Sequence, residues 1–417
     1  MALKYIGANF EHWKICEWAT KSIQAYKDVH FTNDNNDYSK ELTQVQIVDY
    51  LAKKGVSMNY NEPMTIDQIK RKGEKWQRTT YNNIISTHNL VNISQVKGQD
   101  LKIVDTDKYD YILTYSFPCQ DLSLAGKRAG MEKDSGTRSG LLWEVERILD
   151  ECKELGALPK ILLMENVPEI VGANNIEHFK KWRYKLEQLG YSNYDKILNA
   201  KDYGIPQNRR RCFMVSILGE YNYNFPQEIS LKFKQKDMLE LEVDEKYYLT
   251  KKMITYICGN AINKELKDVY NREEALFNKN IAYTLTTKPV RRVGDSNYIV
   301  CGIENELKVK DFLAIIEKNK IKEDEKFYLV LCDQTINKEL SGTIKTEIDI
   351  RKFTNIYHKL RVRKLTPREY GRLMGVRDEY ITKMSKNQSD ASLYHLFGDS
   401  IVVDVLKAIF LQLLEED

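Results

Sequence analysis

The sequence of 417 residues has few of the features that mark several protein classes. It contains only 8 prolines and 20 glycines, too few for a collagen-like or low-complexity chain. Its 7 cysteines form no Cys-x-x-Cys pair and none has a histidine at zinc-like spacing, so we expect neither a metal site nor a disulfide framework. No apolar run approaches the roughly 18 residues of a membrane span, and the start lacks a signal-peptide core. These absences predict a soluble, cytoplasmic protein.

A strong excess of charge is also missing, because 64 Lys and Arg residues oppose 60 Asp and Glu residues and leave a net charge of +4. This value does not by itself indicate a nucleic-acid partner, since local clustering decides whether a positive field exists. The hydrophobic fraction of 42% is that of a folded chain. The length predicts two or three domains on a prior of roughly 150 residues each.

Up to about residue 220, short runs rich in Val, Ile, Tyr and Phe alternate with helix-like stretches. Helices are predicted over 139–155 and 175–189, and Gly190 is expected to end the second one. The alternation predicts an α/β domain with a mostly parallel, doubly wound sheet. Its strands are expected at residues 14–16, 109–117, 160–164, 195–198 and 212–218.

From about residue 221 the pattern changes to Lys-rich polar sequence with short strand-like runs, for example 296–300 and 327–331. Helical periodicity returns only near the carboxyl end. We therefore expect a smaller, partly β domain of residues 221–360, inserted into a main domain formed by 1–220 plus 361–417.

A thiol and a carboxylate follow two of the predicted strands. Cys119 lies on the loop after the run 109–117, and Glu165 ends the run that begins at residue 160. Open α/β sheets bind ligands at the carboxyl ends of their strands, which would bring both groups to one edge. Taken alone, a cysteine after a strand is more often structural than nucleophilic, and acids at strand ends are common.

Three arginines precede the last predicted strand of the main domain. If the strands 195–198 and 212–218 pair antiparallel, the arginines reach the edge that holds Cys119 and Glu165. Strand alternation then sends Arg209 and Arg211 to one side and Arg210 to the other. The alternative interpretation is a solvated beginning of a strand.

Five ordered motifs resemble those of the DNA cytosine-5 methyltransferase family. They are Ser-Phe-Pro-Cys-Gln at 116–120, Glu-Asn-Val at 165–167, Gln-Asn-Arg-Arg-Arg at 207–211, Arg-Lys-Leu-Thr-Pro-Arg-Glu at 363–369 and Gly-Asp-Ser-Ile-Val-Val at 398–403. The resemblance implies a Rossmann-like sheet with an inserted target-recognition domain and S-adenosylmethionine as cofactor. It also implies methylation of cytosine carbon 5 at a specific short sequence in double-stranded DNA by a protein that is a monomer on DNA.

The resemblance implies a role for each matched residue. Cys119 is the expected nucleophile on cytosine carbon 6, Glu165 the acid that donates toward N3, and Arg211 with Arg209 the support of the base and its loop. The implied cofactor-binding residues are Glu17, Trp18, Asp100, Leu101, Pro118, Leu141, Asp399 and Ser400. The implied DNA-binding residues are Ser123, Lys127, Arg128, Arg138, Gln207, Thr284, Arg291, Arg292 and Arg363. No metal is expected.

The target base is unreachable inside a duplex, so the enzyme must flip it out. Residues 121–140 follow the cysteine directly and contain several glycines and cations, which fits a loop that closes over phosphates. The alternative is an ordinary flexible loop.

Two departures from the family pattern stand out. The family opens with a strand and a Phe-x-Gly-x-Gly loop well before its Glu-Trp pair, whereas Glu17 is close to Met1 and residues 6–9 hold one glycine. We expect that loop to be absent, and a separate N-terminal segment or chain to complete the cofactor site. Asp399 stands where the family usually has Asn, and a carboxylate cannot donate amide hydrogen bonds.

Other functions remain open from the sequence alone. One is a DNA-binding remnant that lost its cofactor site, or half of a split enzyme. Another is an RNA cytosine-5 methyltransferase, which the long insert disfavours. A zinc cytosine deaminase would need His-x-Glu and Cys-x-x-Cys motifs, and both are missing.

Overall fold

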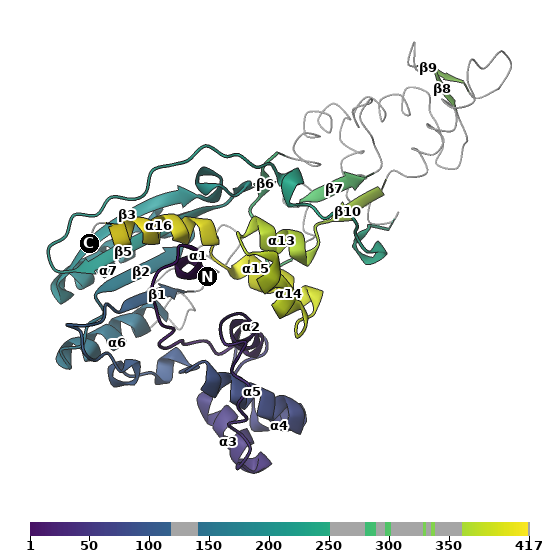
Figure 1. Ribbon diagram of the computed structural model, residues 1–417. Helices are drawn as coiled ribbons and strands as arrows, with labels where there is room; N and C mark the ends of the chain where they lie inside the picture. The colour runs from purple at the N-terminus through teal and green to yellow at the C-terminus, as the bar shows by residue number, and fades with distance from the viewer. Residues whose placement is uncertain are drawn as a thin grey trace.

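The computed structural model describes residues 1–117, 141–250, 280–288, 297–301, 328–330, 335–337 and 361–415. Within them a central sheet carries helices on both faces, and further helices lie to one side of it (Figure 1). This arrangement confirms the α/β class that the sequence predicts.

The central sheet has four strands, in the order β1, β2, β5, β3. β1 and β2 run parallel, whereas β5 is antiparallel to both of its neighbours. The expected mostly parallel sheet is therefore wrong for the described strands. The short connection of residues 200–209 turns the chain straight back, so that β5 pairs with β3. The bounds are Ile112–Ser116 for β1, Ile161–Asn166 for β2, Tyr191–Asn199 for β3 and Arg210–Leu218 for β5.

Helices cover both faces of this sheet (Figure 1). α6 (Leu142–Glu154) and α7 (Ile176–Leu189) pack on one face, and α1 (Ala2–Tyr5) and α16 (Val403–Glu415) pack on the other. The predicted helices at 139–155 and 175–189 are confirmed over their described residues. Gly190 ends α7 in the left-handed conformation with φ 99°, as its position predicts.

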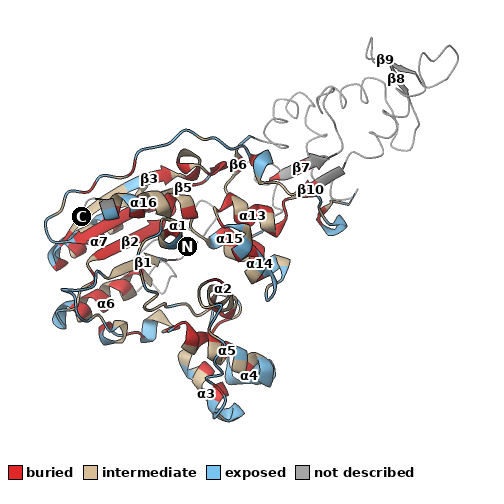
Figure 2. Cartoon of the chain, in the orientation of Figure 1, coloured by how far each residue is buried: buried red, intermediate tan, exposed pale blue. Residues whose placement is uncertain are grey.

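The alternation of side chains along β2 explains the two layers. Leu162 and Met164 pack among the residues of α6 and α7, while Ile161 and Leu163 pack against α1 and α16. All 6 residues of β2 are buried (Figure 2). β2 is thus the centre of the sheet and supplies a rigid base for the residues at its carboxyl end.

A separate group of helices follows the N-terminal segment and has its own apolar core. The expected strand at residues 14–16 is wrong, because Ile15 forms only an isolated parallel bridge with Asn89. The Asn89 side chain bonds both the N–H and the C=O of Glu17, and these bonds replace further strand pairing. The helices of this group are α2 (Thr20–His30), α3 (Gln44–Lys54), α4 (Ile66–Lys70) and α5 (Glu74–Ser86).

A second group of helices lies between the sheet and the inserted region. A capping box between Thr366 and Glu369 starts the first of them. Their bounds are Pro367–Leu373 for α13, Asp378–Ser385 for α14 and Asp390–Asp399 for α15. Short 3-10 turns are at Ile93–Gln95, Gly98–Leu101 (η2), Pro168–Val171, Ala200–Tyr203 (η5), Gln235–Met238 (η6) and Glu245–Tyr247.

The inserted region contributes short strands, as the runs 296–300 and 327–331 predict. β7 pairs with β10 after the insert, and β6 pairs with β4 before it. The chain that follows β5 stays on the main domain, since Tyr203 donates to the carbonyl of Pro226 at 3.1 Å. The domain boundary at residue 221 remains a prediction. The bounds are Gln207–Asn208 for β4, Ala282–Tyr283 for β6, Tyr298–Cys301 for β7, Tyr328–Val330 for β8, Thr335–Asn337 for β9 and Arg361–Lys364 for β10.

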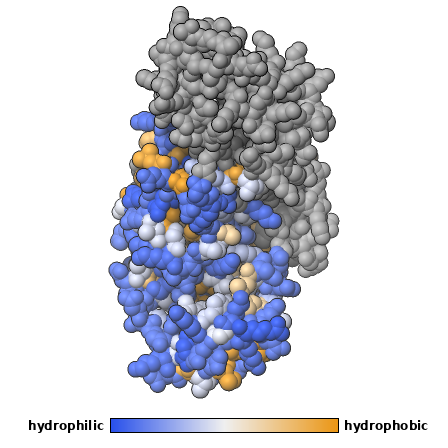
Figure 3. All heavy atoms as spheres, turned by 90° about the vertical axis from the view of Figure 1, so that its right-hand side faces the viewer, coloured by the Kyte–Doolittle hydropathy of each residue, from blue (hydrophilic) through white to orange (hydrophobic). Residues whose placement is uncertain are grey.

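The face of the described residues that Figure 3 turns to the viewer is largely hydrophilic, with small scattered hydrophobic areas. Among the described residues, no helix has both the length and the apolar character that a membrane span requires.

Candidate active site

The carboxyl ends of β1 and β2 meet at one edge of the sheet, because the two strands are parallel with Ser116 opposite Glu165. The Ser116 hydroxyl donates to Glu165 Oε2 at 3.3 Å. The Asn166 amide donates to the carbonyl of Phe117 at 3.1 Å. The Glu-Asn pair therefore fixes the residue at which the chain leaves β1 toward Pro118 and Cys119.

Glu165 is a buried acid that faces a cation. It is 6% exposed, and Arg211 Nε lies 3.1 Å from its Oε1. Burial raises the pKa of Glu165 above its usual value, while the positive charges of Arg211 and Arg209 oppose the shift. A carboxyl group with a raised pKa holds its proton more readily, as a general acid toward a ring nitrogen requires.

The arginines divide between the two sides of β5 as strand alternation predicts. Arg211 points to Glu165, Arg209 is buried with 4% exposure, and Arg210 is exposed. β3 and β5 pair antiparallel, so the start of β5 lies beside the end of β3. The predicted convergence of Glu165 with Arg209 and Arg211 is confirmed.

Arg209 connects the sheet to two distant segments. Its guanidinium donates to the carbonyl of Leu285 at 2.9 Å, of Gly398 at 3.0 Å and of Ser400 at 2.8 Å. Gly398 lies so close to the other segment that an added Cβ would be 2.4 Å from the backbone of Thr286. Only glycine permits this approach, and the bonds of Arg209 hold it.

Gln207 and Thr284 lie at the same junction. Gln207 is fully buried, donates to the carbonyl of Leu373 at 2.6 Å and accepts from the N–H of Leu285 at 3.0 Å. Thr284 donates to the carbonyl of Asn208 at 2.6 Å. Buried with both ends of its amide bonded, Gln207 braces this junction. The expected contact of Gln207 with DNA remains a prediction. The Thr284 contact with DNA remains a prediction.

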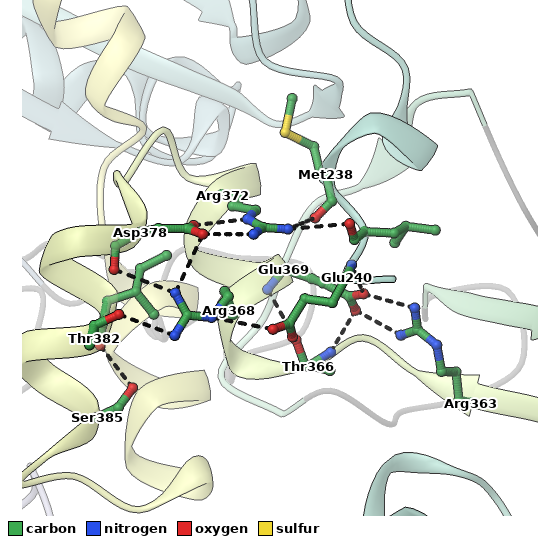
Figure 4. A network of polar contacts seen from close by, with 12 residues as sticks. Met238, Glu240, Arg363, Thr366, Arg368, Glu369, Arg372, Asp378, Thr382 and Ser385 are labelled. Carbon is green, nitrogen blue, oxygen red and sulfur yellow. Dashed lines mark hydrogen bonds and ion pairs between the residues drawn. The ribbon is translucent and has the colours of Figure 1, made fainter. Parts of the chain in front are cut away.

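Arg363, whose expected contact with DNA also remains a prediction, is bonded within the protein. It is 2% exposed and forms two bonds of 2.8 Å with the carboxylate of Glu369, which is itself fully buried (Figure 4). A bidentate pair of this kind fixes geometry and occupies the guanidinium. The position of Arg363 therefore indicates a structural role within the protein.

The ion pair of Arg363 belongs to a wider network (Figure 4). Glu369 also accepts from the N–H groups of Thr366 and Glu240, both within 2.9 Å. Arg372 bridges Asp378 at 2.7 Å to the carbonyls of Met238 and Leu239. The network thus joins the segment after η6 to α13, to the start of α14 and, through Arg363, to β10.

The expected adenosine-binding residues begin with Glu17 and Trp18. Glu17 Oε1 accepts from the N–H of Ala19 at 2.7 Å, and the Trp18 carbonyl accepts from Ser57 at 2.7 Å. Burial raises the pKa of Glu17, the N–H groups of Ala19 and Trp18 lower it, and the negative charge of Asp399 adds to the increase. The structure therefore brings Glu17 and Asp399, which are distant in sequence, into one electrostatic environment.

The other expected cofactor residues occupy neighbouring elements. Asp100 and Leu101 lie in η2, which packs against α6, and Leu141 precedes α6 directly. The Leu101 carbonyl accepts from the Trp13 indole at 2.8 Å, which ties η2 to the segment before Glu17. The Ser400 hydroxyl is turned into α15 and donates to the carbonyl of Leu396 at 2.6 Å.

Three residues near this region had not been expected from the sequence. Asn89 holds the backbone of Glu17, and the rings of Tyr60 and His395 stack at a centroid distance of 4.2 Å. His395 Nδ1 lies 3.3 Å from Asp399 Oδ2. The contact of His395 with Asp399 could have been predicted from the sequence, because the two residues lie four positions apart, as neighbours on one face of a helix do. The contacts of Asn89 and Tyr60 could not, because their partners are distant in the chain.

Several expected site residues lie outside the described residues and stay predictions. They are Pro118, Cys119, Ser123, Lys127, Arg128, Arg138, Arg291 and Arg292. Within the described part of the chain, no group of three or more His, Cys, Asp or Glu could hold a metal ion.

The family model for the C-5 cytosine-specific DNA methylases matches residues 55–415. The chain belongs to this family. The methylase is 33% identical to the type II methyltransferase M2.ScrFI of Lactococcus lactis subsp. cremoris over 421 aligned residues, covering 99% of this chain and 95% of that protein. It is 41% identical to the orphan methyltransferase M.SssI of Spiroplasma monobiae over 216 residues, covering 51% and 54%.

Solved structures agree with the fold of the methylase. The Dnmt2 methyltransferase of S. pombe covers 89% of this chain at a TM-score of 0.51 and 19% identity, with 95% of that chain covered. A Spodoptera frugiperda DNMT2 mutant covers 96% at a TM-score of 0.54 and 16% identity, with 99% of that chain covered. At these identities the likeness shows the fold alone, here the Rossmann-like methyltransferase fold.

The methylase is a DNA cytosine-5 methyltransferase, and its cofactor is S-adenosylmethionine. The described residues fit this cofactor. Glu17 offers a carboxylate for hydroxyl groups, Trp18 is a half-buried aromatic side chain beside it, and the buried Tyr60 hydroxyl has only a weak hydrogen bond with Ser22 among the described residues. Glu17, Trp18 and Asp399 would hold the cofactor, which supplies an electrophilic methyl group.

The raised pKa of Glu165 predicts a specific dependence of stability on pH. The folded state keeps the proton of Glu165 above its usual pKa of 4.5, where the unfolded state releases it. Stability therefore falls as pH rises from about 4.5 to the folded pKa, by up to about 1.4 kcal/mol per pH unit, and is level above it. Glu165→Gln should lack this fall, and the measurement is the difference in urea unfolding free energy between the two proteins across pH.

The exposed Glu154 on α6 provides a matched control, because Glu154→Gln removes the same charge far from Arg211. A wild-type stability that rises relative to Glu165→Gln as pH increases would contradict the protonated state of the buried acid.

Proposed function

We propose that this methyltransferase acts on a flipped-out cytosine at a specific short sequence in double-stranded DNA, through a transient covalent bond to Cys119. The observation that carries the proposal is the buried carboxyl of Glu165 beside Arg211, at the strand end from which the chain continues into Pro118 and Cys119. Its type II relatives support a role in modifying a defined sequence as part of a restriction-modification system.

In the proposed reaction, the residues at this edge of the sheet act one after another. The Cys119 thiolate adds to carbon 6 of the cytosine while Glu165 donates a hydrogen bond or proton to N3, so that electron density moves to carbon 5. Carbon 5 would then receive the methyl group, with S-adenosylhomocysteine as the leaving group, and lose its own proton to a base. Elimination of the thiolate, with return of the N3 proton to Glu165, restores the aromatic ring and leaves 5-methylcytosine.

Arg211 and Arg209 take different parts in this proposal. Arg211 faces Glu165 directly, so its cation supports the electrostatics of the base-binding edge. Arg209 is bonded to three carbonyl groups of the protein, and we assign it the positioning of the segments around Leu285 and Ser400. Cations at this edge also lower the pKa of a nearby thiol and raise its thiolate fraction.

The assignment of the nucleophile has a direct chemical test. Duplex DNA with 5-fluorocytosine at the target blocks the loss of the carbon 5 substituent, so the enzyme with its cofactor should form a stable adduct visible by denaturing gel and mass spectrometry. Cys119→Ser should form none. Cys16→Ser, a change at an exposed free cysteine, should keep the adduct. If the wild-type protein forms no adduct even when a family-type N-terminal segment completes its cofactor site, the chain is a DNA-binding remnant.

Residues 221–360 are proposed to choose the sequence, and cations at their margins are proposed to supply affinity. Replacing Arg291 and Arg292 with Ala should weaken binding to every duplex and reduce the slope of log affinity against log salt by about one per lost phosphate contact. Lys180 and Lys181 on α7 provide the control pair, whose replacement should leave the slope as it is. An unchanged slope in the arginine variant would remove these residues from the interface.

We also propose that a further strand pairs with the free edge of β1 and completes the site for the methionine end of the cofactor, supplied by a separate N-terminal segment or chain. Among the described strands β1 pairs only with β2, and an open edge is a template for another strand. Fusing a family-type segment of roughly 20 to 30 residues, enough for a strand and a loop, ahead of Leu3 should tighten cofactor binding in calorimetry. Equal affinity with and without the segment would exclude this completion.

A further inference from the structure

Tyr60 combines two energetically unfavourable features in the loop between α3 and α4. Its backbone is in the left-handed region with φ 62°, which is rare for a bulky aromatic residue. Its hydroxyl oxygen is buried, and the only hydrogen bond it has among the described residues is a weak one with the Ser22 side chain. Buried polar groups are nearly always well paired, so a hydroxyl with one weak partner requires an explanation.

The ring of Tyr60 is nevertheless held firmly. It stacks on His395 with ring centroids 4.2 Å apart and planes at 10°. His395 lies one turn before Asp399 on α15 and contacts its carboxylate at 3.3 Å. The stack therefore joins the N-terminal helical group to the end of α15, and α2 of the same group lies beside α14 (Figure 1).

The surroundings of the Tyr60 hydroxyl are the residues expected to bind the cofactor. Burial raises the pKa of Tyr60, a side-chain hydrogen bond with Ser22 lowers it, and the carboxylates of Glu17 and Asp399 raise it further. The same Ser22 and Asp399 influence the pKa of Glu17. The hydroxyl is thus protonated at neutral pH and lies near two acids, so it can donate a hydrogen bond to an acceptor that enters between them.

We propose that Tyr60 is a further binding residue of the cofactor site, with its hydroxyl donating to the adenosine part of S-adenosylmethionine and its ring positioned by His395. This inference rests on the proposed role of Glu17 in binding the same part. The bound cofactor would give the buried hydroxyl a stronger partner than the weak contact with Ser22 in the free protein. His395 acts as a positioning residue, because it touches Tyr60 and Asp399.

A purely structural role for Tyr60 would not need the hydroxyl. Phenylalanine would stack on His395 equally well and would remove a buried, weakly paired hydroxyl from the free protein. The two roles therefore predict opposite effects of one substitution. A role of the hydroxyl in cofactor binding predicts that Tyr60→Phe binds the cofactor more weakly without losing stability. A purely structural role predicts no change in cofactor binding.

The experiment compares wild type with Tyr60→Phe, using adenosine, S-adenosylmethionine and S-adenosylhomocysteine as probes. Nuclear magnetic resonance titration extends to millimolar dissociation constants. Tyr60→Phe should weaken the binding of all three probes about fivefold, the effect of one lost hydrogen bond, and leave the urea midpoint unchanged or higher. His395→Ala should also weaken all three, because the ring loses its support. Tyr50→Phe, in α3 of the same helical group, is the matched control and should bind as wild type does.

Each other outcome contradicts the inference in a distinct way. If Glu17→Gln loses affinity while Tyr60→Phe does not, the cofactor site stands and Tyr60 is not part of it. If Tyr60→Phe affects only the two probes with an amino-acid tail, the assignment to adenosine is wrong. If wild type binds none of the probes, the proposed role of Glu17 falls together with that of Tyr60.

Discussion

The geometry of the active edge depends on one buried cation. Arg209 stands between β4 and β5, and its guanidinium bonds three backbone carbonyls from segments that are 76 to 191 residues away in the chain. A buried charge is tolerated only when its hydrogen bonds are satisfied, so these carbonyls must be present for the cation to be stable there. The same bonds fix Leu285 of the insert and the end of α15 against the sheet. Through these bonds Arg209 fixes the positions of Leu285 and of the end of α15, which contains Asp399, relative to the edge that holds Glu165.

Charges of both signs lie in this region. Glu165 faces Arg211, so the proposed base-binding part of the site combines a buried acid with a cation. Glu17 and Asp399 share an acidic environment next to the stack of Tyr60 and His395, and the charges of Arg209 and Arg211 also act on Asp399. This arrangement suits the proposed chemistry, because the cofactor would bring a positively charged sulfonium and the activated cytosine would gain electron density. Asp399 fits this arrangement through its contact with His395 and needs no amide group to do so.

Some polar residues of the sequence motifs join parts of the protein to one another. Gln207 and Arg363 belong to two of the motifs that identify the family, yet both are buried and bonded to protein atoms. Within the described structure they join segments that are far apart in the chain. The network of Glu369, Arg372 and Asp378 does the same for the segment after η6. Residues that join protein segments and residues that contact a ligand are of the same types, so a sequence alone does not distinguish them.

The sequence by itself determined the α/β class, the helices of the main domain and the family, and it predicted the convergence of Glu165 with Arg209 and Arg211 only on the condition that β3 and β5 pair antiparallel. These follow from local periodicity and from motifs whose order is set along one chain. Only the tertiary structure decided the antiparallel position of β5, the loss of the strand at residues 14–16, the burial of Gln207 and Arg363, and the meeting of Tyr60 with His395. In each of these cases the deciding contact joins residues far apart in the chain or depends on burial, and neither partner's local sequence encodes where the other will lie.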